Sequence, residues 1–86
     1  MPVIFAGDLF VTSEHPVMQR LLAMMSDSVK AGREPNPLTA PAAHPYKRID
    51  YILYSHPSHI RCVEYQVIPD GNTAQHRPVL AVFEIR

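Results

Sequence analysis

The stretch RIDYIL, at residues 48–53, is the most informative part of the chain. Isoleucine, leucine and tyrosine occupy both alternating positions as far as residue 55, which predicts a strand over residues 48–55 that is covered on both faces. Asp50 lies inside this apolar run, and a buried carboxylate needs a hydrogen-bonding partner. That partner has to come from another part of the chain.

Three further strands are expected, one before this stretch and two after it. Residues 2–6 form a short apolar run that ends at Gly7 and Asp8, which is typical of a buried strand. Residues 60–68 are rich in β-forming side chains, although they do not alternate cleanly. Residues 78–85 are apolar at both alternating positions until their end, which again predicts a strand with two covered faces.

One helix is expected between the first two strands. Apolar residues spaced three and four apart predict a helix over residues 16–31, with one apolar face. Thr12 and Ser13 are candidate amino-terminal caps, and Gly32 is a plausible stop. Residues 33–47 contain four prolines, which predicts an irregular loop of a length that is often functional.

These elements predict an α+β fold with one main helix and a four-stranded mixed or antiparallel sheet in a single domain. The order is strand, helix, long loop and three strands. One helix can cover only one face of such a sheet, and nothing else in the chain is expected to cover the other. Since a bare apolar face is larger than monomers usually tolerate, the sequence predicts a second layer from outside this chain.

The composition limits the classes of function. The 86 residues are 47% hydrophobic and 19% charged, which indicates a folded globular domain. Eight basic and eight acidic residues give no net charge, which argues against a stand-alone nucleic-acid-binding module. No apolar run is long enough for a membrane helix, and the first residues do not resemble a signal peptide. Because a single cysteine cannot form an intrachain disulfide, we expect a cytoplasmic location.

Three segments, in order, carry a resemblance to a known family. These are PVIFAGD at residues 2–8, RIDYIL at residues 48–53 and QHRPV at residues 75–79. Together they resemble the carboxy-terminal half of an endonuclease/exonuclease/phosphatase domain, also called DNase I-like. The resemblance implies half of an αββα sandwich, with a β-α-β-β-β order and an amino-terminal half that this chain lacks. Function must still be argued from the site.

The resemblance implies Mg²⁺-dependent hydrolysis of phosphate esters and assigns roles to matching residues. Asp8 matches the aspartate that handles the proton of the nucleophile. His76 matches the histidine that contacts the scissile phosphate, and Asp50 matches the carboxylate that orients this histidine. The resemblance thus makes His76 the natural partner for the buried carboxylate of Asp50, and we expect these two side chains to be in contact. Arg77 and Pro78 match the residues that follow the histidine, and a structural role is expected for both.

Two positions depart from the family pattern. Phe10 stands where the family has asparagine, and a phenyl ring offers neither a hydrogen-bond donor nor an acceptor. Gln75 stands where the family has an aspartate on the metal side, and a neutral amide is a poorer ligand for Mg²⁺ than a carboxylate. The histidine–aspartate pair is therefore retained, while one orienting group and one metal-side charge are not.

A zinc site is the main rival interpretation. His56, His59 and Cys62 lie close in sequence, and imidazole and thiolate are ordinary zinc ligands. Their spacing matches no closed zinc motif, so solvated loop histidines and a buried cysteine in a strand are the favoured interpretation.

Three functional hypotheses follow. In the first, the chain is a degenerate half-domain without hydrolase activity of its own, and it associates with a second copy through its open sheet face as a homodimer. In the second, it is a metal-dependent phosphodiesterase or phosphatase completed by another chain that carries the missing amino-terminal half. In the third, it is a non-catalytic binding module. Mg²⁺ is implied by the family resemblance alone.

Overall fold

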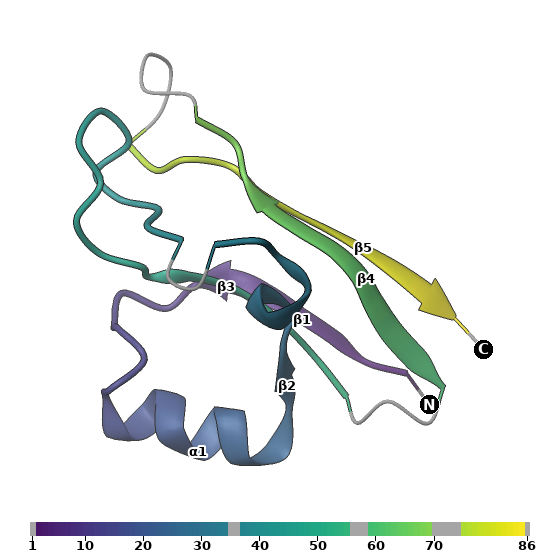
Figure 1. Ribbon diagram of the computed structural model, residues 1–86. Helices are drawn as coiled ribbons and strands as arrows, with labels where there is room; N and C mark the ends of the chain where they lie inside the picture. The colour runs from purple at the N-terminus through teal and green to yellow at the C-terminus, as the bar shows by residue number, and fades with distance from the viewer. Residues whose placement is uncertain (1, 35–36, 56–58, 70–74, 86) are drawn as a thin grey trace.

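The computed structural model describes residues 2–34, 37–55, 59–69 and 75–85. It has an α+β fold, as the sequence predicts (Figure 1). Each predicted strand is present within two residues of its expected bounds. In chain order the elements are β1 (Ile4–Asp8), α1 (Pro16–Met24), β2 (Ser26–Asp27), the 3-10 helix η1 (Ser28–Ala31), β3 (Asp50–Tyr54), β4 (Ile60–Val67) and β5 (Val79–Ile85).

The strands form two antiparallel sheets, so the prediction of a single four-stranded sheet was wrong. The first sheet has the order β1-β3-β2, and the second is the pair β4-β5. β2 is a fifth strand that the sequence did not indicate, in which Ser26 pairs with Tyr54 and Asp27 pairs with Leu53. Because β1 and β2 flank β3 in its sheet, β5 pairs with β4 alone.

The predicted helix over residues 16–31 was too long. Helix α1 ends at Met24, and the amide of the extended residue Met25 closes its last turn by donating to the carbonyl of Leu21. The next residues join β3 as β2, because pairing there also places Asp27 beside a buried arginine. The amino-terminal cap is His15, not Thr12 or Ser13, since its Nδ1 accepts a hydrogen bond from the amide of Val17 at 3.1 Å.

The core lies between α1 and one face of the first sheet. Met18 of α1 and Tyr51 and Leu53 of β3 are fully buried there. The packing around them comes from partly buried apolar side chains, namely Leu9, Val11, Leu21, Leu22 and Met25. Among the described residues, no helix has the length and apolar character needed to cross a membrane.

The opposite face of this sheet is only partly covered, because the ring centre of Tyr54 lies 5.4 Å from that of Phe83 on β5. Side chains alternate between the two faces of a strand, so Asp50, Ile52 and Tyr54 point away from the core that contains Tyr51 and Leu53. Their β1 partners Asp8, Ala6 and Ile4 share this face, and Ile4 is 49% exposed. Within the described chain, the prediction that strand 48–55 is covered on both faces therefore holds fully for the core face and in part for the other, where Ile52 and Tyr54 are partly buried. We call Ile4, Ala6, Ile52 and Tyr54 the open face.

Candidate functional site

The two aspartates singled out in the sequence meet at one end of the open face. Asp8 is the last residue of β1 and Asp50 is the first residue of β3, and they are directly opposite each other in the antiparallel register. Opposed residues in such a pair have neighbouring side chains on the same face. Two carboxylates that are direct neighbours repel one another, so a positive or hydrogen-bonding group between them is favourable.

His76, just before β5, supplies that group. Its Nδ1 lies 2.8 Å from one carboxylate oxygen of Asp50 and 3.1 Å from the other, so the predicted contact is present. The same nitrogen lies 3.7 Å from Oδ2 of Asp8. The three side chains are 19–29% exposed, so they are partly shielded yet open to a ligand.

The pair fixes the chemistry of the imidazole ring. A carboxylate can only accept, so Nδ1 of His76 is the donor and Asp50 the acceptor. Nε2 is then the ring nitrogen that a ligand can use: it accepts in the neutral ring and donates in the protonated ring. Asp50 thus orients His76 as a carboxylate orients the histidine of a catalytic triad.

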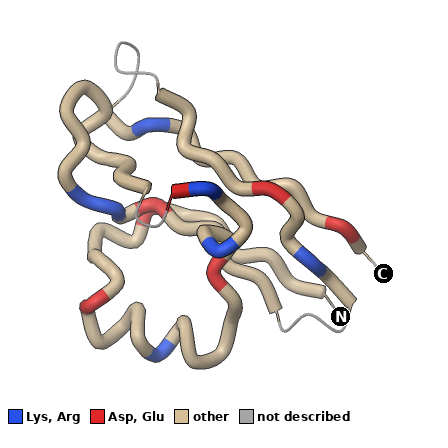
Figure 2. Tube along the Cα trace, in the orientation of Figure 1, with Lys and Arg blue, Asp and Glu red and all other residues tan. Residues whose placement is uncertain are grey.

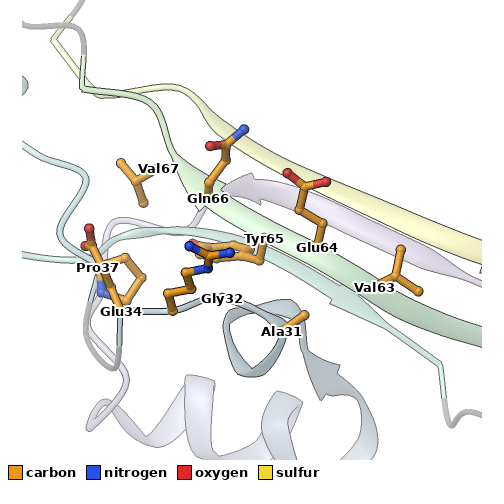
Figure 3. A pocket seen from close by; sticks show the side chains of 10 residues that line it. Ala31, Gly32, Glu34, Pro37, Val63, Glu64, Tyr65, Gln66 and Val67 are labelled. Atoms are coloured by element: carbon orange, nitrogen blue, oxygen red, sulfur yellow. The ribbon is translucent and has the colours of Figure 1, made fainter.

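These residues line a hollow of about 330 Å³ between the ends of β1, β3 and β5. A larger hollow, of about 500 Å³, lies between β4 on one side and residues 31–34 and Pro37 on the other (Figure 3). Tyr65 and Gly32 lie side by side there, and no histidine lines it. We place the candidate site in the smaller hollow, because the carboxylates of Asp8 and Asp50 and the ring of His76 come within 4.8 Å of one another there. Acidic and basic residues are otherwise dispersed along the chain (Figure 2).

Phe10 has an unusual backbone conformation beside the site. Its φ is 59°, in the left-handed region, and its amide donates to Oδ1 of Asp8 at 2.9 Å. The phenyl ring is 79% exposed. Asparagine adopts this conformation more readily than phenylalanine, which gives a backbone reason, besides the side-chain one, for asparagine at this position in the family pattern.

The three site residues are a poor match for a Mg²⁺ shell made by this chain alone. Their ligand atoms lie within 4.8 Å of one another, and they are the only metal-ligand group of this kind in the described residues. Mg²⁺ prefers oxygen ligands, but both oxygens of Asp50 face His76 and Oδ1 of Asp8 accepts from Phe10. Within the part of the chain that the structure describes, Oδ2 of Asp8 is the one carboxylate oxygen of the two aspartates without a hydrogen bond, so we derive no chemical step through a metal ion.

The remaining candidate positions contribute less. Gln75 is exposed, and its carbonyl accepts from the amide of Ala42 at 2.8 Å. His56 of the rival zinc site lies outside the described residues. Cys62 lies in β4, as expected, but it is only partly buried, and its Sγ lies 3.3 Å from the carbonyl oxygen of Glu64.

Sequence reasoning missed a buried ion pair behind the site. The guanidinium of Arg48 donates to both oxygens of Asp27, at 2.8 and 2.7 Å, and lies 4.4 Å from the ring centre of Tyr51. Burial lowers the pKa of Arg48, but hydrogen bonding and the charge of Asp27 outweigh it, so the net shift is upward. The only sequence signal was an arginine at the start of an apolar strand.

Two solved structures share this fold. One is a functionally unknown conserved protein from Enterococcus faecalis V583, 20% identical, with a TM-score of 0.79 over 99% of this chain. The other is a mannosyl-6-phosphatase from Bacteroides thetaiotaomicron VPI-5482, 21% identical, with the same TM-score and coverage. No protein-family model matches the sequence, and no curated protein matches it.

The likeness covers only part of each neighbour. This chain spans 37% of the Enterococcus protein and 38% of the mannosyl-6-phosphatase. At these identities the likeness establishes the fold, and any activity has to be argued from the site.

Proposed function

We propose that this chain is one half of a phosphoric ester hydrolase site of the endonuclease/exonuclease/phosphatase type, inactive alone and completed by a second layer on its open face. The observation that carries the proposal is the Asp50–His76 pair, 2.8 Å apart, with Asp8 opposite. A carboxylate-held imidazole beside a second carboxylate supplies one orienting, one donating and one proton-accepting group.

Each of the three residues has a role that fits its contacts. Asp50 holds the ring of His76 through Nδ1, so a protonated ring can donate from Nε2 to a phosphate oxygen. Asp8 has Oδ2 available to accept a proton from an attacking water. These are half of the groups that such a hydrolysis needs, because the metal-side ligands are not supplied here.

Two substitutions argue that the half-site has lost function. Gln75 brings no charge for a cation, and the phenyl ring of Phe10 cannot orient a substrate. Loss of one preorganised donor alone lowers rates by about 10²–10³. We therefore expect ester binding to outlast ester hydrolysis in this chain.

The fold comparison supports the proposal indirectly. One structure with this fold is a mannosyl-6-phosphatase, and this chain corresponds to 38% of it. A chain that corresponds to part of a larger fold calls for a complementary part to complete the site. The single cysteine keeps the cytoplasm as the proposed compartment.

Titration with phenyl phosphate, followed by NMR, tests the proposal. The ring and amide signals of His76 and the amide of Asp8 should shift on titration, and His76→Asn should abolish the shifts. His44→Asn, which changes an exposed loop histidine, is the control and should bind as the wild type does. Turnover of bis-nitrophenyl phosphate by the chain alone, or shifts confined to other residues, would contradict the proposal.

A second experiment tests the lost metal side. The double variant Phe10→Asn/Gln75→Asp restores both groups of the family pattern. It should bind Mg²⁺ at least about tenfold more tightly than the wild type in calorimetric titration, since it adds a carboxylate. Equal affinities would mean that the residues at 10 and 75 do not face the site.

The partner that fits the open face best is a second copy of this chain. The face is apolar, it carries the site at one end, and closed twofold dimers are the commonest oligomers. Packing two such faces together would also bury Ile4, which is now 49% exposed. A different chain carrying an amino-terminal half is the alternative occupant.

A further inference from the structure

The segment 39–42 links the two elements that carry the Asp50–His76 pair. It belongs to the long loop between η1 and β3. It forms hydrogen bonds with the residues on both sides of His76 and with Ile49, which precedes Asp50. Loops in compact proteins usually lie at the surface, yet Thr39 is 0% exposed and Ala42 is 2% exposed.

Hydrogen bonds to this segment bracket His76. The amide of Arg77 donates to the carbonyl of Thr39 at 2.7 Å, and the amide of Ala42 donates to the carbonyl of Gln75 at 2.8 Å. Nε of Arg77 also donates to the carbonyl of Ala42 at 2.8 Å. Both neighbours of the histidine are therefore tied to one short stretch of backbone.

The same segment is tied to the start of β3. The amide of Thr39 donates to the carbonyl of Lys47 at 2.9 Å, and the amide of Ile49 donates to Oγ1 of Thr39 at 3.3 Å. Ile49 directly precedes Asp50. Thr39 therefore contacts the neighbours of both members of the pair: its carbonyl accepts from Arg77, which follows His76, and its hydroxyl accepts from Ile49, which precedes Asp50.

We infer that Thr39 and Arg77 are positioning residues for the Asp50–His76 pair. A hydrogen bond between two side chains on separate elements persists only where their backbones are held in register, to within about 0.5 Å. Nε of Arg77 is committed to Ala42, so this part of the guanidinium acts through the loop and not on a ligand. A role for these two residues in catalysis rests on the proposed function, whereas their role in holding the pair in place does not require any turnover.

Ring-nitrogen NMR of the intact chain tests the inference. In the neutral ring the Asp50 carboxylate stabilises the tautomer with the proton on Nδ1. Thr39→Val keeps the shape but removes the acceptor for Ile49, and Arg77→Met removes the Nε donor. Each should change the ratio of the two His76 tautomers by about two- to tenfold, the effect of one lost hydrogen bond. Thr39→Ser should retain the wild-type ratio.

Ser28→Ala is the matched control. It removes another buried hydroxyl, but one without a hydrogen-bond partner in the described chain, and it should leave the tautomer ratio unchanged. Amide spectra show which variants fold. If Thr39→Val does not fold, Arg77→Met decides the test. The inference would be overturned if the tautomer ratio of His76 were unchanged in whichever of Thr39→Val and Arg77→Met fold. It would also be overturned if Ser28→Ala changed the ratio equally. Neither outcome depends on phosphate binding, so the proposed function can fail separately.

Discussion

At the scale of single residues, Phe10 has a backbone conformation that its side chain does not favour. It stands where the family pattern has asparagine, and it has a φ of 59°. The left-handed region costs most side chains about 1–2 kcal/mol, and asparagine less than most. The turn that presents Asp8 is thus retained with a residue that does not favour it.

Replacing Phe10 should therefore stabilise the protein. We expect Phe10→Asn to raise the free energy of unfolding by about 1 kcal/mol, because it relieves the backbone strain and exposes less apolar surface. Urea unfolding measures the change. Phe10→Ala removes the exposed ring but keeps a non-glycine side chain at positive φ, so it should give a smaller gain. Equal gains from both variants would rule out the backbone explanation.

Tyr65 gives a prediction for alkaline pH. Its ring is 4% exposed, and burial raises its pKa, although the nearby charge of Arg48 opposes the shift; Tyr51 is shifted in the same direction for the same first cause. The folded state thus holds both protons more tightly than the unfolded chain, whose tyrosines titrate near about 10. Stability should be constant below that pH and fall as the pH rises through the raised values.

Urea unfolding between about pH 8 and 11 checks this dependence. Tyr65→Phe should flatten the alkaline fall. It should cost little at neutral pH, because the Tyr65 hydroxyl makes no hydrogen bond of good geometry to a described residue. Tyr46→Phe changes a ring that is 71% exposed and should keep the wild-type slope. If the free energy of unfolding of Tyr65→Phe fell more steeply with pH than that of the wild type, the direction given for the pKa shift of Tyr65 would be wrong.

At the scale of elements, Gly32 ends a helix at the predicted position, but the physical reason for a glycine there differs from the expected one. The sequence predicts a helix stop there, and Gly32 does cap a helix, but that helix is η1. A Cβ on this residue would lie 3.0 Å from the carbonyl oxygen of Tyr65 and 3.1 Å from its ring. Glycine therefore allows η1 to approach β4 closely, while its φ of −88° is open to other residues.

A pair of glycine substitutions tests this reading. Gly32→Ala should lower the free energy of unfolding by about 1–3 kcal/mol, because the added methyl meets backbone that cannot move freely. Gly7→Ala is the control: nothing lies within 4 Å of its Cβ position, so it should be neutral or slightly stabilising. Thermal or urea unfolding of both proteins measures the difference, and a neutral Gly32→Ala would mean that the two elements separate easily.

The end of α1 shows the limit of periodic patterns. Val29 continues the three-and-four spacing of the helix, so no local feature near Met24 marks a stop. The chain leaves the helix because Asp27 pairs with β3 and binds Arg48, which is 21 residues away. Contacts between distant residues outweigh local helix preference here, and a pattern within one segment carries no information about them.

At the scale of the whole molecule, the open face predicts association. We expect the wild type to form a dimer at micromolar concentration, and Ile4→Lys to weaken it by about 100-fold or more, since a twofold interface loses this side chain from both copies. Sedimentation velocity measures this. Met24→Lys, which changes a side chain that is 65% exposed on α1, should dimerise normally. A monodisperse wild-type monomer would exclude the second copy as the occupant.

The sequence by itself determined the α+β class, the position of four strands and the Asp50–His76 contact. The strands follow from apolar or β-forming runs of neighbouring residues, and the contact follows from the cost of an unpaired carboxylate in an apolar strand together with the family resemblance. Only the tertiary structure decided the division into two sheets, the short strand β2 and the loop that supports His76. These depend on which strand edges are already occupied and on backbone hydrogen bonds between distant segments. Backbone groups are the same in every residue, so side-chain identity does not specify those pairings.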